Sequence, residues 1–122
     1  MAQRGHVLVN GAGRMGLMAA SAEACMEAGG QAIGVIPQFM IEQGWQHKGM
    51  SQLIVTRDMH ERKERMAELS DACVALPGGV GTLEELLEII TWRQVAETAE
   101  EAVHLCETTP EWDKNLQKFA AL

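Results

Sequence analysis

Short apolar runs alternate with helix-like segments along this chain, and this alternation constrains the fold most. Each run is rich in Val, Ile or Leu without polar interruption, which is typical of strands buried on both faces. The segments between the runs are long enough to cross from one parallel strand to the next. This order predicts a doubly wound, Rossmann-like α/β fold, a parallel sheet with helices on both faces. The predicted strands are His6–Asn10, Ala32–Ile36, Leu53–Thr56 and Cys73–Leu76.

Helices are predicted between and after these strands. The first ends at Gly29-Gly30, a pair typical of helix C-termini. Phe39–Met50 has no clear period and is predicted to be a loop with about one helical turn. The predicted helices are Met15–Ala28, Met59–Ser70, Thr82 to about Gln94, and Ala96–Leu122 with an interruption near Pro110.

Composition indicates a single cytoplasmic domain. The 122 residues are enough for one domain, residues 1–122, with a core that needs no disulfide bond. The formal net charge of −7 repels a polyphosphate backbone, so nucleic acid is not an expected partner. Three cysteines without metal-ligand spacing are expected to be reduced and to bind no metal. No apolar run reaches the ~20 residues of a membrane helix, and the first residues lack a signal-peptide pattern, so no membrane is expected.

The first glycine cluster, Gly11–Gly16, follows a predicted strand and opens a helix. Its pattern G-x-G-x-x-G matches the dinucleotide fingerprint. That fingerprint also requires an acidic residue at the end of the next strand, and Val35–Gln38 has none. Three interpretations stay open: an NAD site, a tight turn that only permits close packing, or a loop that lines another kind of nucleotide site.

The second cluster lies in Pro77–Glu85, whose sequence is PGGVGTLEE. Its glycines let consecutive N–H groups point the same way, and the following helix adds its positive dipole end. This combination predicts a site for one phosphate group. No Lys-Ser or Lys-Thr follows, so ATP-driven chemistry is not indicated. In the alternative interpretation Thr82 and Glu85 form a capping box that only satisfies backbone amides.

Arg62 and Lys63 follow the third predicted strand closely and are therefore expected on the ligand side of the sheet. A guanidinium there can hold a phosphate or a sugar hydroxyl. The alternative is a solvated helix face with i,i+4 pairs such as Glu61–Arg65. His47 and His60 are predicted to be surface residues.

Met59–Lys63 followed by Pro77–Glu85 resembles, in order and spacing, the motifs of the Lonely Guy family of cytokinin-activating phosphoribohydrolases. Members carry an Arg-Lys pair upstream of PGGxGTxxE, and the similarity extends from about Gly5 to Gln94. The resemblance implies hydrolysis of the N-glycosidic bond of a purine nucleoside 5′-monophosphate, AMP or an N6-substituted AMP. The products are the free base and ribose 5-phosphate. It also implies a homodimer without a metal or an organic cofactor.

The resemblance assigns roles by motif position. Arg62 and Glu85 correspond to the catalytic pair. A carboxylate suits this reaction because the sugar gains positive charge as the bond breaks. The corresponding nucleotide-binding residues, with the glycine loop taking the 5′-phosphate, are Lys63, Gly78, Gly79, Gly81 and Thr82.

The chain also departs from the family pattern. Members usually have a further strand and helix before the position of Gly5 and a further strand and helix after that of Gln94. The chain is therefore predicted to lack a first βα unit and a late β/α unit. Relatives with the same loop include proteins that bind molybdenum cofactor, so the alternative is a non-catalytic nucleotide- or cofactor-binding carrier. Glu85 favours the enzyme, because a phosphate carrier gains nothing from a carboxylate beside the anion.

Lysine decarboxylation is an activity sometimes attached by name to such sequences. It requires a lysine placed to form a Schiff base with pyridoxal phosphate. Lys63, at a charged helix start, is not placed for that role.

Overall fold

The computed structural model of the protein describes residues 1–94. The chain divides into two compact units, residues 1–76 and the segment that begins at Pro77. The helix predicted over Ala96–Leu122 lies outside the described residues. Among those residues, no helix has the length and apolar character needed to span a membrane.

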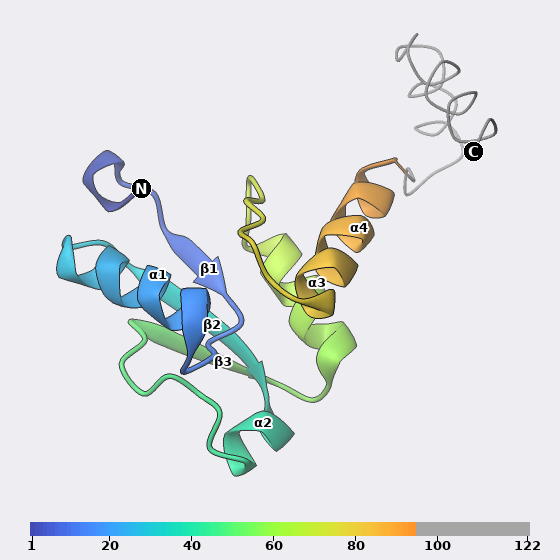
Figure 1. Cartoon of the computed structure of the whole chain (residues 1–122), viewed down its shortest axis with the longest axis horizontal. Coiled ribbons are helices and arrows are strands. Elements are labelled where there is room, and N and C mark those ends of the chain that lie inside the picture. The colour runs from blue at the N-terminus through green and yellow to red at the C-terminus, as the bar shows by residue number, and fades with distance from the viewer. Residues whose placement is uncertain (95–122) are drawn as a thin grey trace, which may run out of the picture. The chain divides into compact units, whose positions relative to one another are not determined.

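The first unit is built on a three-stranded parallel sheet in the order β1-β2-β3 (Figure 1). β2 is central and pairs with both neighbours. The parallel direction brings the carboxyl ends of all three strands to one edge of the sheet. The three matching predictions are confirmed to within two residues at each end. The strands are β1 (Leu8–Asn10), β2 (Ala32–Pro37) and β3 (Gln52–Thr56).

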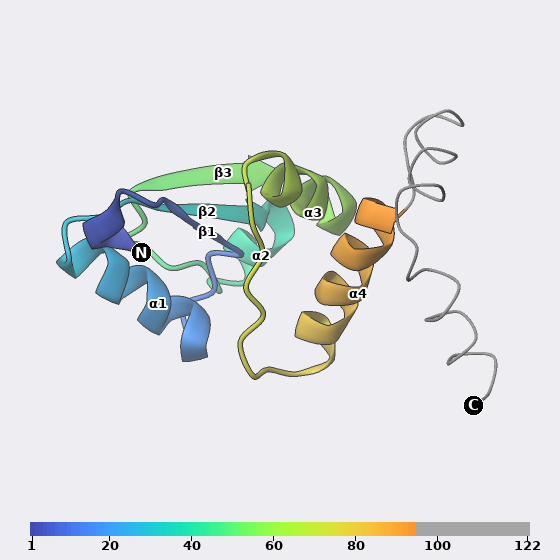
Figure 2. The same cartoon turned by 90° about the horizontal axis from the view of Figure 1, so that it is seen from above.

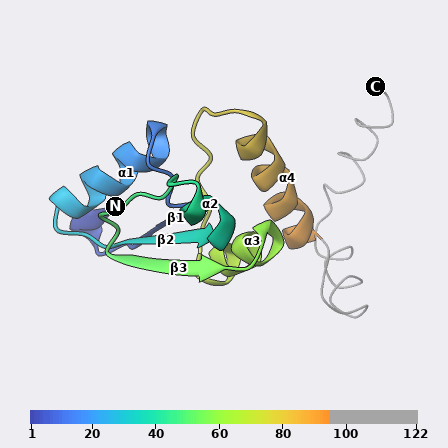
Figure 3. The same ribbon diagram turned by 90° about the horizontal axis from the view of Figure 1, so that it is seen from below.

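Helices connect these strands. α1 (Gly16–Glu27) contacts β1 and β2, α2 (Gln38–Glu42) follows β2, and α3 (Met59–Glu68) contacts β2 and β3. Figures 2 and 3 show α1 and α2 on the same side of the sheet. This is the parallel α/β architecture of doubly wound, Rossmann-like folds, as predicted.

The core of the first unit lies around β2. Val35, Ile36 and Pro37 are its largest fully buried side chains. α1 contributes small buried residues at i, i+3 and i+6, namely Ala19, Ala22 and Cys25. Small side chains on this face let the helix lie close to the sheet.

The predicted fourth strand, Cys73–Leu76, is not a strand. The sheet of the described residues contains only β1, β2 and β3. Val74 and Leu76 are 76% and 47% exposed. The composition of a segment favours a strand only where a neighbouring strand supplies ladder hydrogen bonds and a face to bury. Cys73–Leu76 has neither among the described residues.

The second unit contains α4 (Val80–Gln94), preceded by Pro77-Gly78-Gly79. α4 begins two residues before the predicted start at Thr82. The reason is that the carbonyl of Gly79 accepts hydrogen bonds from Thr82 N (3.1 Å) and Leu83 N (3.4 Å), which closes the first turn around Gly79.

Candidate functional site

The end of β3 and the start of α3 place Arg62. Thr56 is buried at the end of β3, and its hydroxyl donates to the carbonyl of Asp58 (3.2 Å). Asp58 caps α3 because its Oδ1 accepts from Glu61 N at 2.9 Å. Arg62 follows within the first turn of α3, at the carboxyl edge of the sheet, as expected.

The Arg62 side chain is buried, with 6% of the residue exposed. Its Nε donates to the carbonyl of Val35 (3.0 Å) and its Nη2 donates to the carbonyl of Gly11 (3.0 Å). The guanidinium therefore joins β2 to the turn that follows β1. The alternative that Arg62 belongs to a solvated helix face is wrong, because backbone carbonyls of two other segments bind it inside the unit.

The other charged residues of α3 lie at its surface, but the expected Glu61–Arg65 pair is not the one observed. Glu61 Oε2 accepts from Arg57 Nε (2.9 Å) and Arg57 N (2.8 Å), so its carboxylate turns back over the start of the helix. Arg65 instead pairs with Glu68. Lys63 is half-buried on the same helix.

Two carboxyl groups at the start of α3 have pKa values below their ordinary ones. The hydrogen bond from the backbone N–H of Glu61 lowers the pKa of Asp58. Hydrogen bonds from the backbone and then the side chain of Arg57 lower the pKa of Glu61. Both groups favour the ionised form in the folded protein.

The first glycine turn is where Arg62 binds. A Cβ atom on Gly11 would collide with the Arg62 guanidinium, so Gly11 allows the close approach. The next residue, Ala12, is buried and has φ 52°, in the left-handed region. The Asn10 side chain makes hydrogen bonds with this turn and with the helix that follows it. Its Oδ1 accepts from Ala12 N (2.9 Å), and its Nδ2 donates to the carbonyl of Met18 in α1 (3.0 Å).

The loop between α2 and β3 is attached to the same turn. The Trp45 carbonyl accepts from Arg14 N (3.0 Å), and His47 N donates to the carbonyl of Ala12 (2.8 Å). Gly13 and Gln46 form an antiparallel bridge between these contacts. This part of the predicted loop thus supports the glycine turn.

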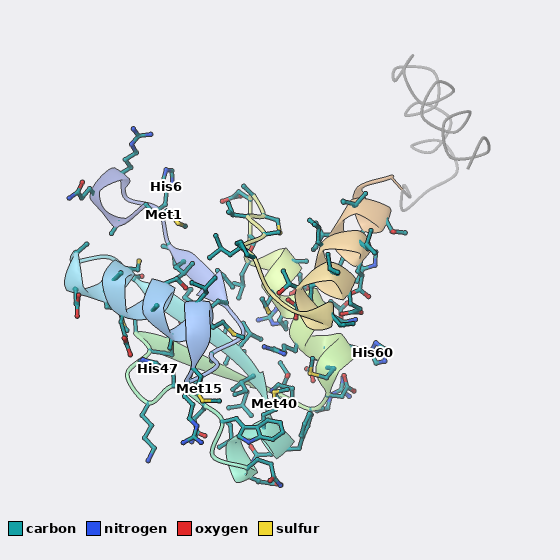
Figure 4. All side chains as sticks on the ribbon, viewed as in Figure 1. Met1, His6, Met15, Met40, His47 and His60 are labelled. Atoms are coloured by element: carbon teal, nitrogen blue, oxygen red, sulfur yellow. The ribbon has the colours of Figure 1, made fainter. Side chains whose placement is uncertain are left out.

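His47 is not a surface residue, contrary to prediction, since only 13% of its side chain is exposed. Its Nδ1 accepts from Gly49 N (3.0 Å), so in the neutral ring Nε2 carries the proton and donates to Glu23 Oε1 (3.0 Å). His47 thereby lies against α1, as Figure 4 shows. His60 is exposed, as predicted, and projects outward from α3 (Figure 4).

In the second unit, packing explains the glycine at position 78 of the loop but not the glycines at positions 79 and 81. A Cβ atom on Gly78 would collide with the hydroxyl of Thr82, so that hydroxyl lies against the Gly78 backbone. A Cβ atom on Gly79 or Gly81 would meet no atom of the described residues within 4 Å. Neither residue has a positive φ. The fold of the described residues therefore does not require glycine at positions 79 and 81.

The capping-box interpretation of Thr82 and Glu85 is wrong. Thr82 is the third residue of α4 rather than the residue before it, so it cannot act as the N-cap. Glu85 lies in the second turn, three residues after Thr82 and four after Gly81, on the same side of the helix.

The structure thus brings Arg62 together with the first glycine turn, and Thr82 together with Gly78. The pairing of Arg62 with Glu85 in catalysis stays a prediction. Asn10 and His47 were not expected to contribute to the site. An Asn directly before a glycine turn is a recognisable signal, because its side chain readily bonds the backbone two residues on.

Comparison with known proteins identifies relatives. A model of the family described as "Possible lysine decarboxylase" matches residues 18–121. A cytokinin riboside 5′-monophosphate phosphoribohydrolase of Rhodococcoides fascians is 51% identical over 86 residues, 70% of this chain and 43% of that relative. A protein of the same name from Arabidopsis thaliana is 48% identical over 88 residues, 72% of this chain and 39% of the relative.

A probable cytokinin riboside 5′-monophosphate phosphoribohydrolase of Oryza sativa subsp. japonica is 44% identical over 95 residues, 78% of this chain and 43% of the relative. The chain therefore spans about two-fifths of the length of these relatives. The family model, in contrast, covers most of the chain. This protein belongs to the family described as possible lysine decarboxylases, the Lonely Guy family that its motifs resemble.

Proposed function

We propose that this protein hydrolyses the N-glycosidic bond of a purine nucleoside 5′-monophosphate of the cytokinin type. Water adds to C1′ of the ribose, the bond to the base breaks, and the base leaves with a proton. The products are the free base and ribose 5-phosphate. The names of the relatives, which share 44–51% of aligned residues with this chain, support the proposal.

The observation that carries the proposal is that the fold of the described residues does not need glycine at position 79 or 81. Gly81 is the second residue of α4, and glycine is a poorer helix former than alanine. A bare backbone at the start of a helix suits close approach of a phosphate group, which binds the first N–H groups and the positive dipole end. We therefore assign the 5′-phosphate to the loop of Gly78, Gly79, Gly81 and Thr82.

Glu85 supplies the carboxylate for the reaction. It lies four residues after Gly81, about 6 Å along the helix axis, which is of the order of the step from a 5′-phosphate to its sugar. There it stabilises the positive charge that develops on the ribose or activates the attacking water. Arg62 and Lys63 supply cations at the carboxyl edge of the sheet, where ligands of parallel α/β folds bind. In this proposal Arg62 orients the ribose.

The test measures release of adenine from AMP and of the free base from the N6-isopentenyl analogue, each with ribose 5-phosphate. Glu85→Gln is expected to lower kcat at least about 100-fold, because it removes the charge that acts in the transition state, while AMP binding persists. Glu84→Gln, an adjacent change of the same kind on α4, is the matched control and keeps the activity. Equal activity in the two variants, or no release by a folded wild-type chain, would contradict the proposal.

We also propose that the protein is a homodimer in the cytoplasm. The family resemblance supports the dimer, and the cysteine pattern supports a reducing compartment. The carrier alternative is not favoured, because the relatives above are named as hydrolases. Turnover of AMP, rather than its retention, distinguishes the two functions.

A further inference from the structure

Ala12 has an unusual backbone for its residue type. It is the only non-glycine among the described residues with a positive φ, 52°, and it is fully buried. Residues other than glycine, asparagine and aspartate rarely adopt this conformation, because the Cβ atom of an L-residue crowds the following carbonyl. Strained residues of this kind persist where the surroundings hold them, and they cluster at functional sites.

Packing explains why Ala12 is an alanine. Its methyl group lies over β2, since a Cβ atom on Gly34 would be 2.5 Å from the Ala12 Cβ. The methyl group thus fills the space that Gly34 leaves open. This contact alone does not set the orientation of the peptide groups on either side of Ala12.

Three hydrogen bonds set that orientation. The carbonyl before Ala12, that of Gly11, accepts from Arg62 Nη2 (3.0 Å). The N–H of Ala12 donates to Asn10 Oδ1 (2.9 Å), and the carbonyl of Ala12 accepts from His47 N (2.8 Å). Of these partners, only the Asn10 side chain comes from the residue that directly precedes the turn.

Asn10 uses both ends of its carboxamide. While Oδ1 holds Ala12, Nδ2 donates to the carbonyl of Met18 in the first turn of α1 (3.0 Å). An aspartate at this position keeps the acceptor but has no proton to donate to Met18 when ionised. Asn10 therefore ties the left-handed turn to the start of α1 at one side, while Arg62 holds the turn at the other.

We propose that Asn10 is a positioning residue for Arg62. It holds Ala12 in the left-handed region, so the Gly11 carbonyl faces the guanidinium and fixes its orientation at the carboxyl edge of the sheet. Its effect on turnover rests on the proposed function, in which Arg62 acts on the nucleotide. The effect of Asn10 on the orientation of the Arg62 side chain does not depend on the proposed function.

The first measurement is turnover of AMP by Asn10→Ala, Asn10→Asp and the double variant Asn10→Ala/Ala12→Gly. A misplaced Arg62 is expected to lower kcat of Asn10→Ala about 10- to 100-fold, with KM within about twofold of the wild-type value. Asn10→Asp is expected to fall between Asn10→Ala and the wild type. Glycine adopts positive φ without support, so the added Ala12→Gly change is expected to restore most of the lost kcat. A loss of kcat that Ala12→Gly does not restore would contradict the proposal.

The second measurement is the ¹⁵N NMR signal of the Arg62 Nε–H, which needs no activity. In the wild type this proton is hydrogen-bonded to the Val35 carbonyl. Asn10→Ala is expected to shift or broaden the signal, and the double variant is expected to return it toward the wild-type position. An unchanged signal in Asn10→Ala would overturn the proposal. A changed and restored signal in a chain that releases no base would uphold the positioning role and reject the proposed function instead.

Discussion

Gly11 and Arg62 depend on each other at the level of single atoms. The guanidinium occupies the place where any other residue at position 11 would have its Cβ atom. The Gly11 carbonyl in turn accepts one of the hydrogen bonds that the buried guanidinium needs. A buried charge without such partners is costly, so the two positions are expected to be energetically coupled.

A double-mutant cycle tests this coupling. Gly11→Ala is expected to lower the free energy of unfolding by about 1–3 kcal/mol, the usual cost of overpacking. In the Arg62→Ala background the obstructing group is absent, so the same change is expected to cost much less. Denaturant unfolding of the four chains measures both values. Equal costs in the two backgrounds would show that the guanidinium does not occupy this place.

Sequence reasoning predicted the location of Arg62 but not its environment. Its position after β3 follows from the strand pattern, because a helix start after a parallel strand lies at the carboxyl edge. Its hydrogen bonds with Val35 and Gly11 link residues 27 and 51 positions away, and no local pattern encodes such contacts. His47 was misjudged for the same reason, since its partner Glu23 lies in a helix 24 positions earlier.

At the scale of elements, the start of α3 decides where Arg62 points. Asp58 and Glu61 bind the first backbone N–H groups around this start, and both have pKa values below the ordinary 3.8 and 4.5. Such carboxylates stabilise the fold at a pH above their ordinary pKa values. This stabilisation is lost as the pH falls through the lower values of the folded state.

Asp58→Asn is therefore expected to lower stability at pH 7 and to reduce the loss of stability on acidification from about pH 5 to pH 3. Asparagine keeps a capping oxygen but has no proton to release. Urea midpoints at several pH values measure the effect. Asp71→Asn, an exposed aspartate beyond the end of α3, is the control and is expected to leave the pH profile as in the wild type. Identical profiles for the two variants would contradict the assignment.

Elements with a partner in the sheet were predicted well. β1, β2, β3, α1 and α3 agree with the sequence prediction to within two residues at each end, because apolar runs and glycine stops encode them locally. The segment Cys73–Leu76 was wrongly predicted to be a strand, because a strand also needs a neighbouring strand, and pairing is not a property of the segment itself. The start of α4 was placed late because Thr82 resembles an N-cap, while Gly79 closes the first turn.

At the scale of the whole molecule, the assignment of residues 1–122 to one nucleotide-binding domain stays a prediction. The proposed homodimer can be tested directly. Sedimentation equilibrium is expected to give twice the 13.3 kDa mass of one chain. Dilution is expected to lower the molar mass and the specific activity together if the dimer completes the site. A monomer with full activity would reject the dimer while leaving the proposed reaction intact.

The Arg62–Gly11 hydrogen bond also has a consequence for folding. It closes a loop of 51 positions, and its geometry exists only after β1 has paired with β2 and α3 has docked on the sheet. Contacts of such long range form late, because chain entropy opposes them until local structure is in place. We therefore expect the hydrogen bonds that hold the Arg62 guanidinium to be among the last features of the first unit to form, and to be absent from a chain that has only collapsed.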